Sequence, residues 1–124
     1  MYELKMMIVM RKDLNLRKGK MVAQGAHAAI LGMTEVVDYG IGRERLARIT
    51  EWIATGMAKI CVGVDSLEQF EDIGKRAQVA GLEVHTVTDA GYTEFHGIPT
   101  VTCMAIGPNL VSQIDVITGD LKLL

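Results

Sequence analysis

The sequence has little of the residues and patterns that mark several common classes of protein. It has two cysteines, two prolines and 5% aromatic residues in a chain of 124 residues. Cys61 and Cys103 form no C-x-x-C motif and show no metal-site spacing, so neither a zinc centre nor a disulfide framework is indicated. Each lies in an apolar run, and we therefore expect both to be buried, reduced thiols. With so few aromatic residues, the core must be aliphatic.

Long apolar runs and an excess of one charge are lacking too. The net charge is −2, which excludes a general role in coating nucleic acid. The apolar run from Met6 to Met10 is too short for a signal sequence or a membrane span, so we expect a cytoplasmic protein without membrane contact. No G-x-G-x-x-G follows a predicted strand, the stretch from Arg17 to Lys20 lacks the flanking residues of a phosphate-binding loop, and the three histidines lack zinc-ligand spacing. We expect no metal and no cofactor.

The apolar pattern instead predicts one α/β domain spanning residues 1–124. Apolar residues make up 49% of the chain and the mean hydropathy is +0.23, as in a compact globular protein. Buried or alternating runs predict strands, and amphipathic runs bounded by glycine or capping residues predict helices. The expected order is strand 4–10, helix from 18–20 to about 37, helix 43–55, strand 59–64, helix from 66 to about 80, strand 82–88, strand 100–106 and helix 110–117. This order predicts three layers, with a four-stranded, mostly parallel mixed sheet and helices on both of its faces.

Local signals add detail to this pattern. The stretch from Asp65 to Gln69 contains two overlapping capping boxes, so a helix begins there. The strand at 82–88 alternates polar and apolar residues, which favours a place at the edge of the sheet. Asn109 follows a Gly-Pro turn and is expected to cap the last helix.

The stretch from Arg17 to Ala28 combines cations with a helix of small residues. If the helix begins at 18–20, Lys20, Gln24 and His27 project from one face, because they lie four and three residues apart. The rest of that helix is small or apolar and suited to packing on a sheet. A polar stripe on such a helix is costly unless it lines a cavity or has partners. The stripe therefore indicates a site, and an ordinary solvated face is the alternative.

The loop before this helix is locally basic. Residues 11–20 contain five cations and one acid, a local balance of 5 − 1 = +4. Such a patch can hold a ligand that carries phosphate groups. A solvated, charged loop is the alternative.

Asp89 closes the third predicted strand and is followed by Ala-Gly. Ligands in α/β sheets bind at the carboxyl ends of strands, and both the basic loop and Asp89 lie at such ends, so we expect the two segments to converge. A lysine beside a carboxylate can hold a phosphate, stabilise an oxyanion or act as a base, and Thr93 adds a hydroxyl. These groups suit attack of water on an ester, since no G-x-S-x-G motif is present. A purely turn-forming Asp89 is the alternative.

Several separated motifs lie in register over essentially the whole chain. They are Arg11-x-Asp13-Leu14, Lys18-Gly19-Lys20-Met21-x-Ala23-Gln24 with His27-Ala28, Asp89-Ala90-Gly91-x-Thr93, Thr100-x-Thr102-x-x-Ala105-Ile106-Gly107-Pro108, and Ile114-Asp115-x-x-Thr118-Gly119-Asp120-Leu121-Lys122-Leu123-Leu124. Together they resemble the type 2 peptidyl-tRNA hydrolase family. The resemblance implies a small cytosolic α/β enzyme, commonly a homodimer, that cleaves the ester between a peptide and the terminal ribose of tRNA. It implies no redox cofactor.

The resemblance also implies roles for individual residues. Catalysis falls on Lys20, with Lys18 beside it, and on Asp89 and Thr93. The cationic loop would hold the tRNA phosphates, and two residues of the helix would line the site. The residues expected to bind the substrate are Arg11, Arg17, Lys18, Gln24 and His27.

The chain departs from the family pattern in three places. It has Gly25-Ala26 where a polar pair is usual, Leu16-Arg17 where Met-Gly is usual, and a loop at 92–100 without the usual Pro-Gly-Thr ending. The loop borders the expected site and bears on substrate identity more than on fold. Two alternatives to peptidyl-tRNA hydrolysis are therefore kept: a non-catalytic adaptor that binds RNA or protein through the same face, and a hydrolase of a related ester or amide.

Overall fold

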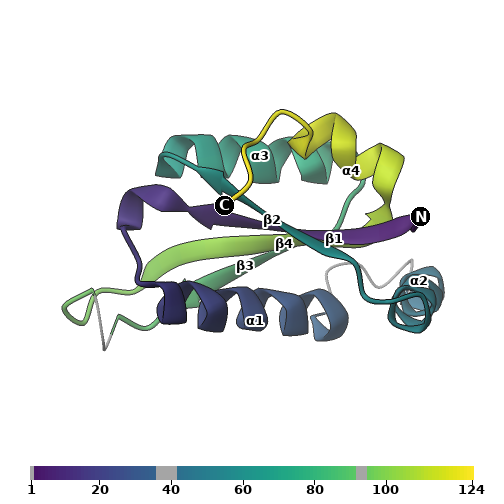
Figure 1. Cartoon of the computed structure of the whole chain (residues 1–124), viewed down its shortest axis with the longest axis horizontal. Coiled ribbons are helices and arrows are strands. Elements are labelled where there is room, and N and C mark those ends of the chain that lie inside the picture. The colour runs from purple at the N-terminus through teal and green to yellow at the C-terminus, as the bar shows by residue number, and fades with distance from the viewer. Residues whose placement is uncertain (1, 36–41, 92–94) are drawn as a thin grey trace.

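The computed structural model describes residues 2–35, 42–91 and 95–124, and within them the chain alternates between helices and strands (Figure 1). The elements are β1 (Leu4–Arg11), a short 3-10 helix η1 (Lys12–Leu14), α1 (Lys18–Thr34), α2 (Gly42–Ala54), β2 (Lys59–Val64), α3 (Leu67–Val79), β3 (Val84–Asp89), β4 (Thr100–Leu110) and α4 (Val111–Thr118). The predicted elements are all present. The first helix ends at Thr34, and the rest of its predicted length, 36–37, lies outside the described residues.

The four strands form one mixed sheet in the order β2-β1-β4-β3. β1 pairs with β2 in parallel, whereas β4 lies between β1 and β3 and is antiparallel to both. The four-stranded mixed sheet is confirmed. It has one parallel pair and two antiparallel pairs, however, so it is less parallel than the sequence predicted. The first three strands nevertheless point the same way, because β1 and β3 are both antiparallel to β4 and are therefore parallel to each other. Their carboxyl ends therefore lie at one end of the sheet.

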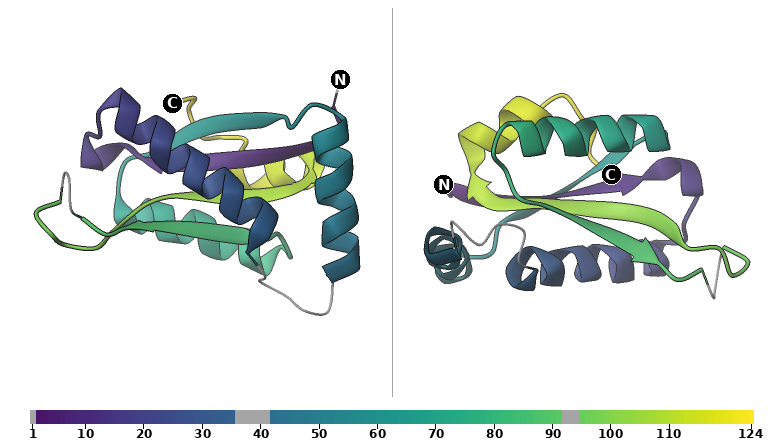
Figure 2. Two further views of the ribbon diagram at one scale, coloured as in Figure 1. Left: turned by 90° about the horizontal axis from the view of Figure 1, so that it is seen from below. Right: turned by 180° about the vertical axis from the view of Figure 1, so that it is seen from behind.

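Helices cover both faces of this sheet (Figures 1 and 2). α1 lies on one face, α3 and α4 lie on the other, and α2 stands at the end of the sheet near the N-terminus. Successive residues of β1 point to opposite faces, so Met7 and Val9 belong to the core under α3 and α4, while Met6 and Ile8 belong to the core under α1. The predicted three-layer arrangement is confirmed.

The local signals had mixed outcomes. The helix start at Asp65–Gln69 is confirmed, and of the two overlapping boxes the one between Ser66 and Gln69 provides the cap. Ser66 Oγ accepts from Gln69 N at 3.0 Å, and Gln69 Oε1 accepts at 2.8 Å from the amide of Asp65, the residue before the cap. The place of β3 at the sheet edge is also confirmed. Asn109 as a helix cap is wrong, because it is the penultimate residue of β4 and Leu110 holds the cap position of α4. The Asn109 side chain accepts from Leu110 N at 2.7 Å and donates to Glu83.

The prediction of two buried thiols is right for Cys103 and wrong for Cys61. Cys103 lies in β4, an inner strand with a neighbour on each side, and is fully buried. Cys61 lies in β2, which is an outer strand, and its side chain is exposed. An apolar run shows that a strand is buried on average, but not which of its residues faces a gap in the covering layer.

Candidate active site

Lys20 and Asp89 form an ion pair at the carboxyl end of the sheet. The Lys20 Nζ and Asp89 Oδ1 atoms lie 2.8 Å apart, and the two side chains are 16% and 13% exposed. Lys20 is the third residue of α1, and Asp89 is the last residue of β3. The two meet because β1 and β3 point in the same direction, so that the loop after β1 and the turn after β3 leave the sheet at the same end.

The Asp89 carboxylate accepts hydrogen bonds on both oxygens. Oδ1 also accepts from Gln24 Nε2 at 3.3 Å, and Oδ2 accepts from Gly91 N at 2.8 Å. The hydrogen bond from Lys20 holds the pKa of Asp89 below its ordinary value of 3.8, burial acts in the opposite direction, and the Gly91 amide lowers the pKa further. Asp89 is therefore ionised at neutral pH.

Gly91 shapes the turn that presents this carboxylate. Its φ is +88°, and a Cβ at this position would lie 2.3 Å from the carbonyl oxygen of Ile98, so a larger residue is excluded. The bond from Gly91 N to Asp89 Oδ2 is the Asx turn that the sequence allowed as an alternative account of Asp89. The turn and the contact with Lys20 coexist, because each uses a different carboxylate oxygen.

Gln24 connects Asp89 to a residue of β4 that the sequence did not indicate. Thr102 Oγ1 donates to Gln24 Oε1 at 2.5 Å, so the amide group of Gln24 points its NH₂ toward Asp89. The Cys103 thiol donates to the Gln24 carbonyl at 3.3 Å, and burial raises the pKa of this thiol to about 11. Gln24 and Thr102 are 2% and 0% exposed, so their bonds to each other satisfy groups that water does not reach.

A β-bulge in β4 explains why the alternation of the sequence does not indicate Thr102 as a residue of this site. Val87 pairs with Cys103, but Thr88 pairs with Val101, which leaves Thr102 as an extra residue in β4. Strict alternation would place Thr102 and Cys103 on opposite faces of the sheet. The bulge turns both toward α1. The only signal in the sequence was the position of Thr102 within one of the family motifs.

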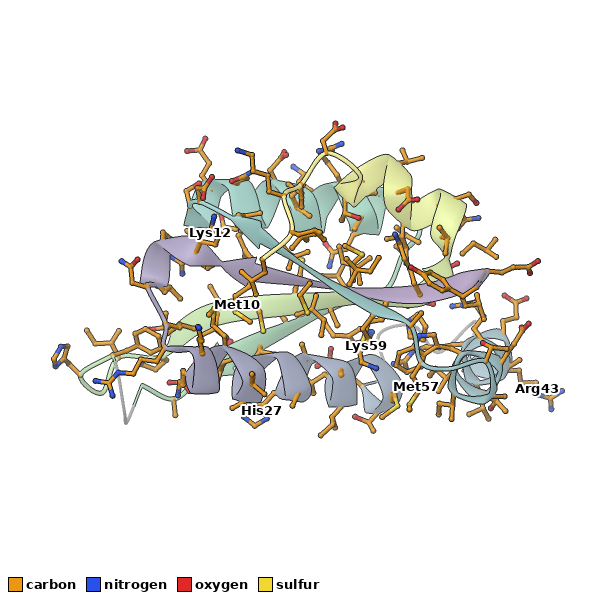
Figure 3. All side chains as sticks on the ribbon, in the orientation of Figure 1. Met10, Lys12, His27, Arg43, Met57 and Lys59 are labelled. Atoms are coloured by element: carbon orange, nitrogen blue, oxygen red, sulfur yellow. The ribbon has the colours of Figure 1, made fainter. Side chains whose placement is uncertain are left out.

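The other residues expected to bind the substrate are placed in three different ways. Arg17 and Lys18 are exposed at the start of α1. His27 is exposed and projects from α1 away from the sheet (Figure 3), so it does not join Lys20 and Gln24 on Asp89. The Arg11 guanidinium bonds to Asp13 at 2.7 Å and to the Val101 carbonyl at 3.0 Å, which ties the loop to β4.

Three further observations concern the earlier expectations. Thr93, expected in the catalytic group, lies outside the described residues. Among the residues that the structure describes, no three His, Cys, Asp or Glu side chains are placed to hold a metal ion together. No described helix is both long enough and apolar enough to cross a membrane.

The fold and the site define an α/β protein with a lysine–carboxylate pair and a buried amide at the carboxyl ends of its strands. The chain matches the family described as peptidyl-tRNA hydrolase PTH2 over residues 4–124. The peptidyl-tRNA hydrolase of Methanocaldococcus jannaschii is 40% identical to it over 98% of this chain and 100% of its own length. That of Saccharolobus solfataricus is 39% identical over 98% of this chain and 99% of its own length. The chain belongs to the PTH2 family, as the resemblance of its motifs predicted.

Proposed function

We propose that the protein hydrolyses the ester between a peptide and the terminal ribose of tRNA, and so returns tRNA from stalled or aborted translation. The observation that carries the proposal is the ion pair between Lys20 and Asp89 at 2.8 Å, in a chain that belongs to the PTH2 family throughout its length. An adaptor that only binds RNA needs cations, but it has no need for a lysine held by a carboxylate that is itself fixed by Gln24 and Gly91.

The geometry suggests a role for each group. A water oxygen adds to the ester carbonyl carbon, and the ammonium of Lys20 stabilises the negative charge that develops on the carbonyl oxygen. A carboxylate with a lowered pKa is a weak base, so we assign to Asp89 the orientation of Lys20 and of the water rather than the removal of a proton. Gln24 keeps Asp89 in place. The bond from carbon to the ribose oxygen then breaks, and that oxygen takes the proton that the attacking water gives up, which leaves a free peptide carboxyl group and a ribose hydroxyl. Thr93 supplies a hydroxyl to this group, as the family resemblance implies.

Binding of the tRNA falls on the exposed cations at the start of α1. Arg17 and Lys18 are both exposed there, within one helical turn of Lys20. Arg11 contributes to this region mainly by fixing the loop, since its guanidinium already bonds to Asp13 and Val101. Phosphate contacts of this kind release counterions, so the affinity for tRNA should fall steeply as the salt concentration rises.

The resemblance also supports a homodimer in the cytoplasm. A groove of about 640 Å³ between α1 and β2 is lined mainly by apolar side chains. Two residues beside it, Val22 and Leu124, are 72% and 47% exposed. Exposed apolar surface of this kind fits an interface with a second copy of the chain. Light scattering on the purified protein gives the mass of the assembly and tests this part of the proposal.

The decisive experiment uses tRNA that carries an N-acetylated amino acid, with unblocked aminoacyl-tRNA as the control. We expect release of the N-acetylated amino acid by the purified protein, and little or no turnover of the unblocked substrate. Binding without release would favour the adaptor. Turnover of simple esters or amides in preference to tRNA would favour the related hydrolase.

A further inference from the structure

The two outer strands of the sheet differ in how their free edges are covered. The C-terminal segment covers β2, since Gly63 N donates to Lys122 O and Leu124 N donates to Cys61 O, each at 3.0 Å. In the described ranges of the chain, no strand covers the outer edge of β3. Proteins usually protect a free edge with lysine, proline or a covering segment. The sequence of β3, Val-His-Thr-Val-Thr-Asp, contains neither lysine nor proline.

The pairing with β4 shows which backbone groups of β3 point outward. Gly107 N donates to the Glu83 carbonyl at 3.0 Å, so these two residues form a hydrogen-bonded pair. Hydrogen-bonded and non-hydrogen-bonded pairs alternate along an antiparallel ladder. His85 therefore directs its backbone groups toward β4. Val84 and Thr86 direct their amides and carbonyls away from β4, toward the free edge.

Cavities lie beside this strand on both faces of the sheet. On the α1 face, a cavity of about 310 Å³ lies between His27 of the helix and Val87 of β3. On the α3 face, a cavity of about 570 Å³ lies between Phe70 of the helix and Val84 with Thr86 of β3. The side chains of an extended peptide point alternately to the two faces of a sheet. A strand added at β3 would direct successive side chains toward these two cavities.

The charges around the Lys20–Asp89 pair distinguish the two arms of the substrate. The exposed cations Arg17 and Lys18 lie toward the N-terminal end of α1 and suit the RNA arm. The cavity on the α1 face lies further along the same helix, and neither its lining nor β3 contains lysine or arginine. On the α3 face, the cavity lining contains one acid and one base, Glu71 and Lys75, and so has no net charge. The edge of β3 lacks the excess of cations found at the start of α1 and therefore suits the peptide arm.

We propose that the peptide of peptidyl-tRNA binds as an added strand at the outer edge of β3, with its C-terminal carbonyl at Lys20 and Asp89. This inference rests on the proposed function and adds the mode of peptide recognition. The peptide runs parallel to β3, because its reacting end lies where β3 ends. Main-chain hydrogen bonds give affinity without regard to side chains, which suits an enzyme whose substrates carry peptides of any sequence.

The length of β3 sets the length of peptide that benefits. Thr86 lies three residues before Asp89, about 10 Å along a strand, so a single N-acetylated residue does not reach its outward groups. A peptide of about three residues reaches Thr86, and a peptide of about five residues reaches Val84. The value of kcat/KM should therefore rise over this range and then level off.

The first experiment uses the wild-type protein and tRNA carrying N-acetyl-alanine or N-acetylated peptides of two, four and six alanines. We expect kcat/KM to rise a few-fold to about tenfold between one residue and four, as one or two added hydrogen bonds would produce. N-methylation of single peptide amides should reduce kcat/KM at alternate positions only. Rates that do not depend on length, or that fall equally at every methylated position, would overturn the proposal.

The second experiment removes the outward amide of β3. Thr86→Pro deletes this N–H without removing a bond to β4, and Thr86→Val is the matched control, which keeps the N–H and loses only the hydroxyl. We expect Thr86→Pro to hydrolyse N-acetyl-alanyl-tRNA at the wild-type rate, but its kcat/KM should not rise with the length of the peptide. Thr86→Val should match the wild-type protein in both respects. A full gain with length in folded Thr86→Pro would overturn the proposal.

The remaining outcomes separate this inference from others. If the wild-type protein fails on N-acetyl-alanyl-tRNA, the proposed hydrolase function itself is wrong. If Thr86→Pro changes the mass of the assembly in light scattering but keeps the gain with length, the β3 edge pairs with a second copy and the inference is overturned. If Thr86→Pro does not fold, the methylated substrates on the wild-type protein decide the question by themselves.

Discussion

The two faces of the sheet are built on the same four strands but serve different purposes. The core under α3 and α4 consists mainly of apolar residues, with members such as Phe70, Ile73 and Ile114. The buried polar side chains that contact α4 are few and have partners, Asp115 for Lys5 and the Ile114 carbonyl for Thr118. The core under α1 is interrupted by polar groups, among which Thr102, Gln24, Asp89 and Lys20 form a continuous chain of hydrogen bonds. The face under α3 and α4 therefore contributes mainly to the free energy of folding, whereas part of the buried surface under α1 holds polar groups in position.

The α1 face contains a further buried polar residue, His85, which shows the cost of this arrangement. His85 is fully buried, and its Nδ1 atom lies 3.0 Å from Glu35 Oε1. Burial lowers the pKa of His85, while the hydrogen bond with Glu35 acts in the opposite direction. A neutral imidazole in this position is compatible with an apolar environment, whereas a protonated one is not. The buried polar side chains of this face thus either have hydrogen-bond partners, as Gln24 and Thr102 do, or favour the neutral form, as His85 does.

The largest expected effect comes from removing charge on the α1 face. Asp89→Asn keeps an oxygen that can accept from Lys20 but loses the negative charge, and Lys20→Met keeps the stem and loses the ammonium. We expect each to lower kcat/KM on N-acetyl-aminoacyl-tRNA by about 10² to 10⁴-fold. The free energy of unfolding should fall by about 1–3 kcal/mol, because the two side chains are mostly buried and the partner that remains loses a hydrogen bond. Turnover at the wild-type rate in both variants would remove these residues from the mechanism.

The opposite result is expected on the other face. Ile114 is fully buried in the apolar core, and Ile114→Ala should lower the free energy of unfolding by about 2–5 kcal/mol in urea titrations. Its kcat/KM per folded molecule should equal that of the wild-type protein, since Ile114 contacts none of the groups around Asp89. A loss of activity in fully folded Ile114→Ala would contradict the separation of the two faces.

A smaller effect concerns the protonation of Asp89. Its pKa in the folded protein is below the ordinary value of 3.8, mainly because Lys20 donates a hydrogen bond to it. Asp89 therefore stabilises the folded state fully above pH 3.8, and this contribution is lost as the pH falls through the lower pKa of the folded state. In carbon-detected NMR titrations of the carboxyl group, we expect the pKa of Asp89 to rise in Lys20→Met. The Gln24→Leu variant, with Lys20 intact, should raise the pKa less, because the hydrogen bond from Gln24 lowers the pKa less than that from Lys20. An unchanged pKa in Lys20→Met would show that Lys20 is not the main cause.

The sequence by itself determined the order of helices and strands, because apolar periodicity, capping residues and glycine act over short stretches of chain. It also placed Lys20 and Gln24 on one face of a helix, since helical geometry fixes residues four apart. The convergence of Lys20 with Asp89 followed from the direction of the strands, which crossover connections constrain. That expectation survived the misjudged pairing of the strands, because direction and not adjacency brings the two ends together.

Only the tertiary structure decided which strands are neighbours and which residues the faces receive. The insertion of β4 between β1 and β3 is a long-range pairing that no local pattern encodes. The bulge at Thr102 breaks the alternation of side chains by which a sequence predicts the two faces of a strand. It brings the Thr102 hydroxyl to Gln24, although strict alternation would place it on the opposite face. The covering of β2 by the C-terminal segment likewise depends on where a distant segment lies. Sequence periodicity reports how each element meets its surroundings on average, whereas the position of an individual hydrogen-bonding group depends on contacts between segments far apart in the chain.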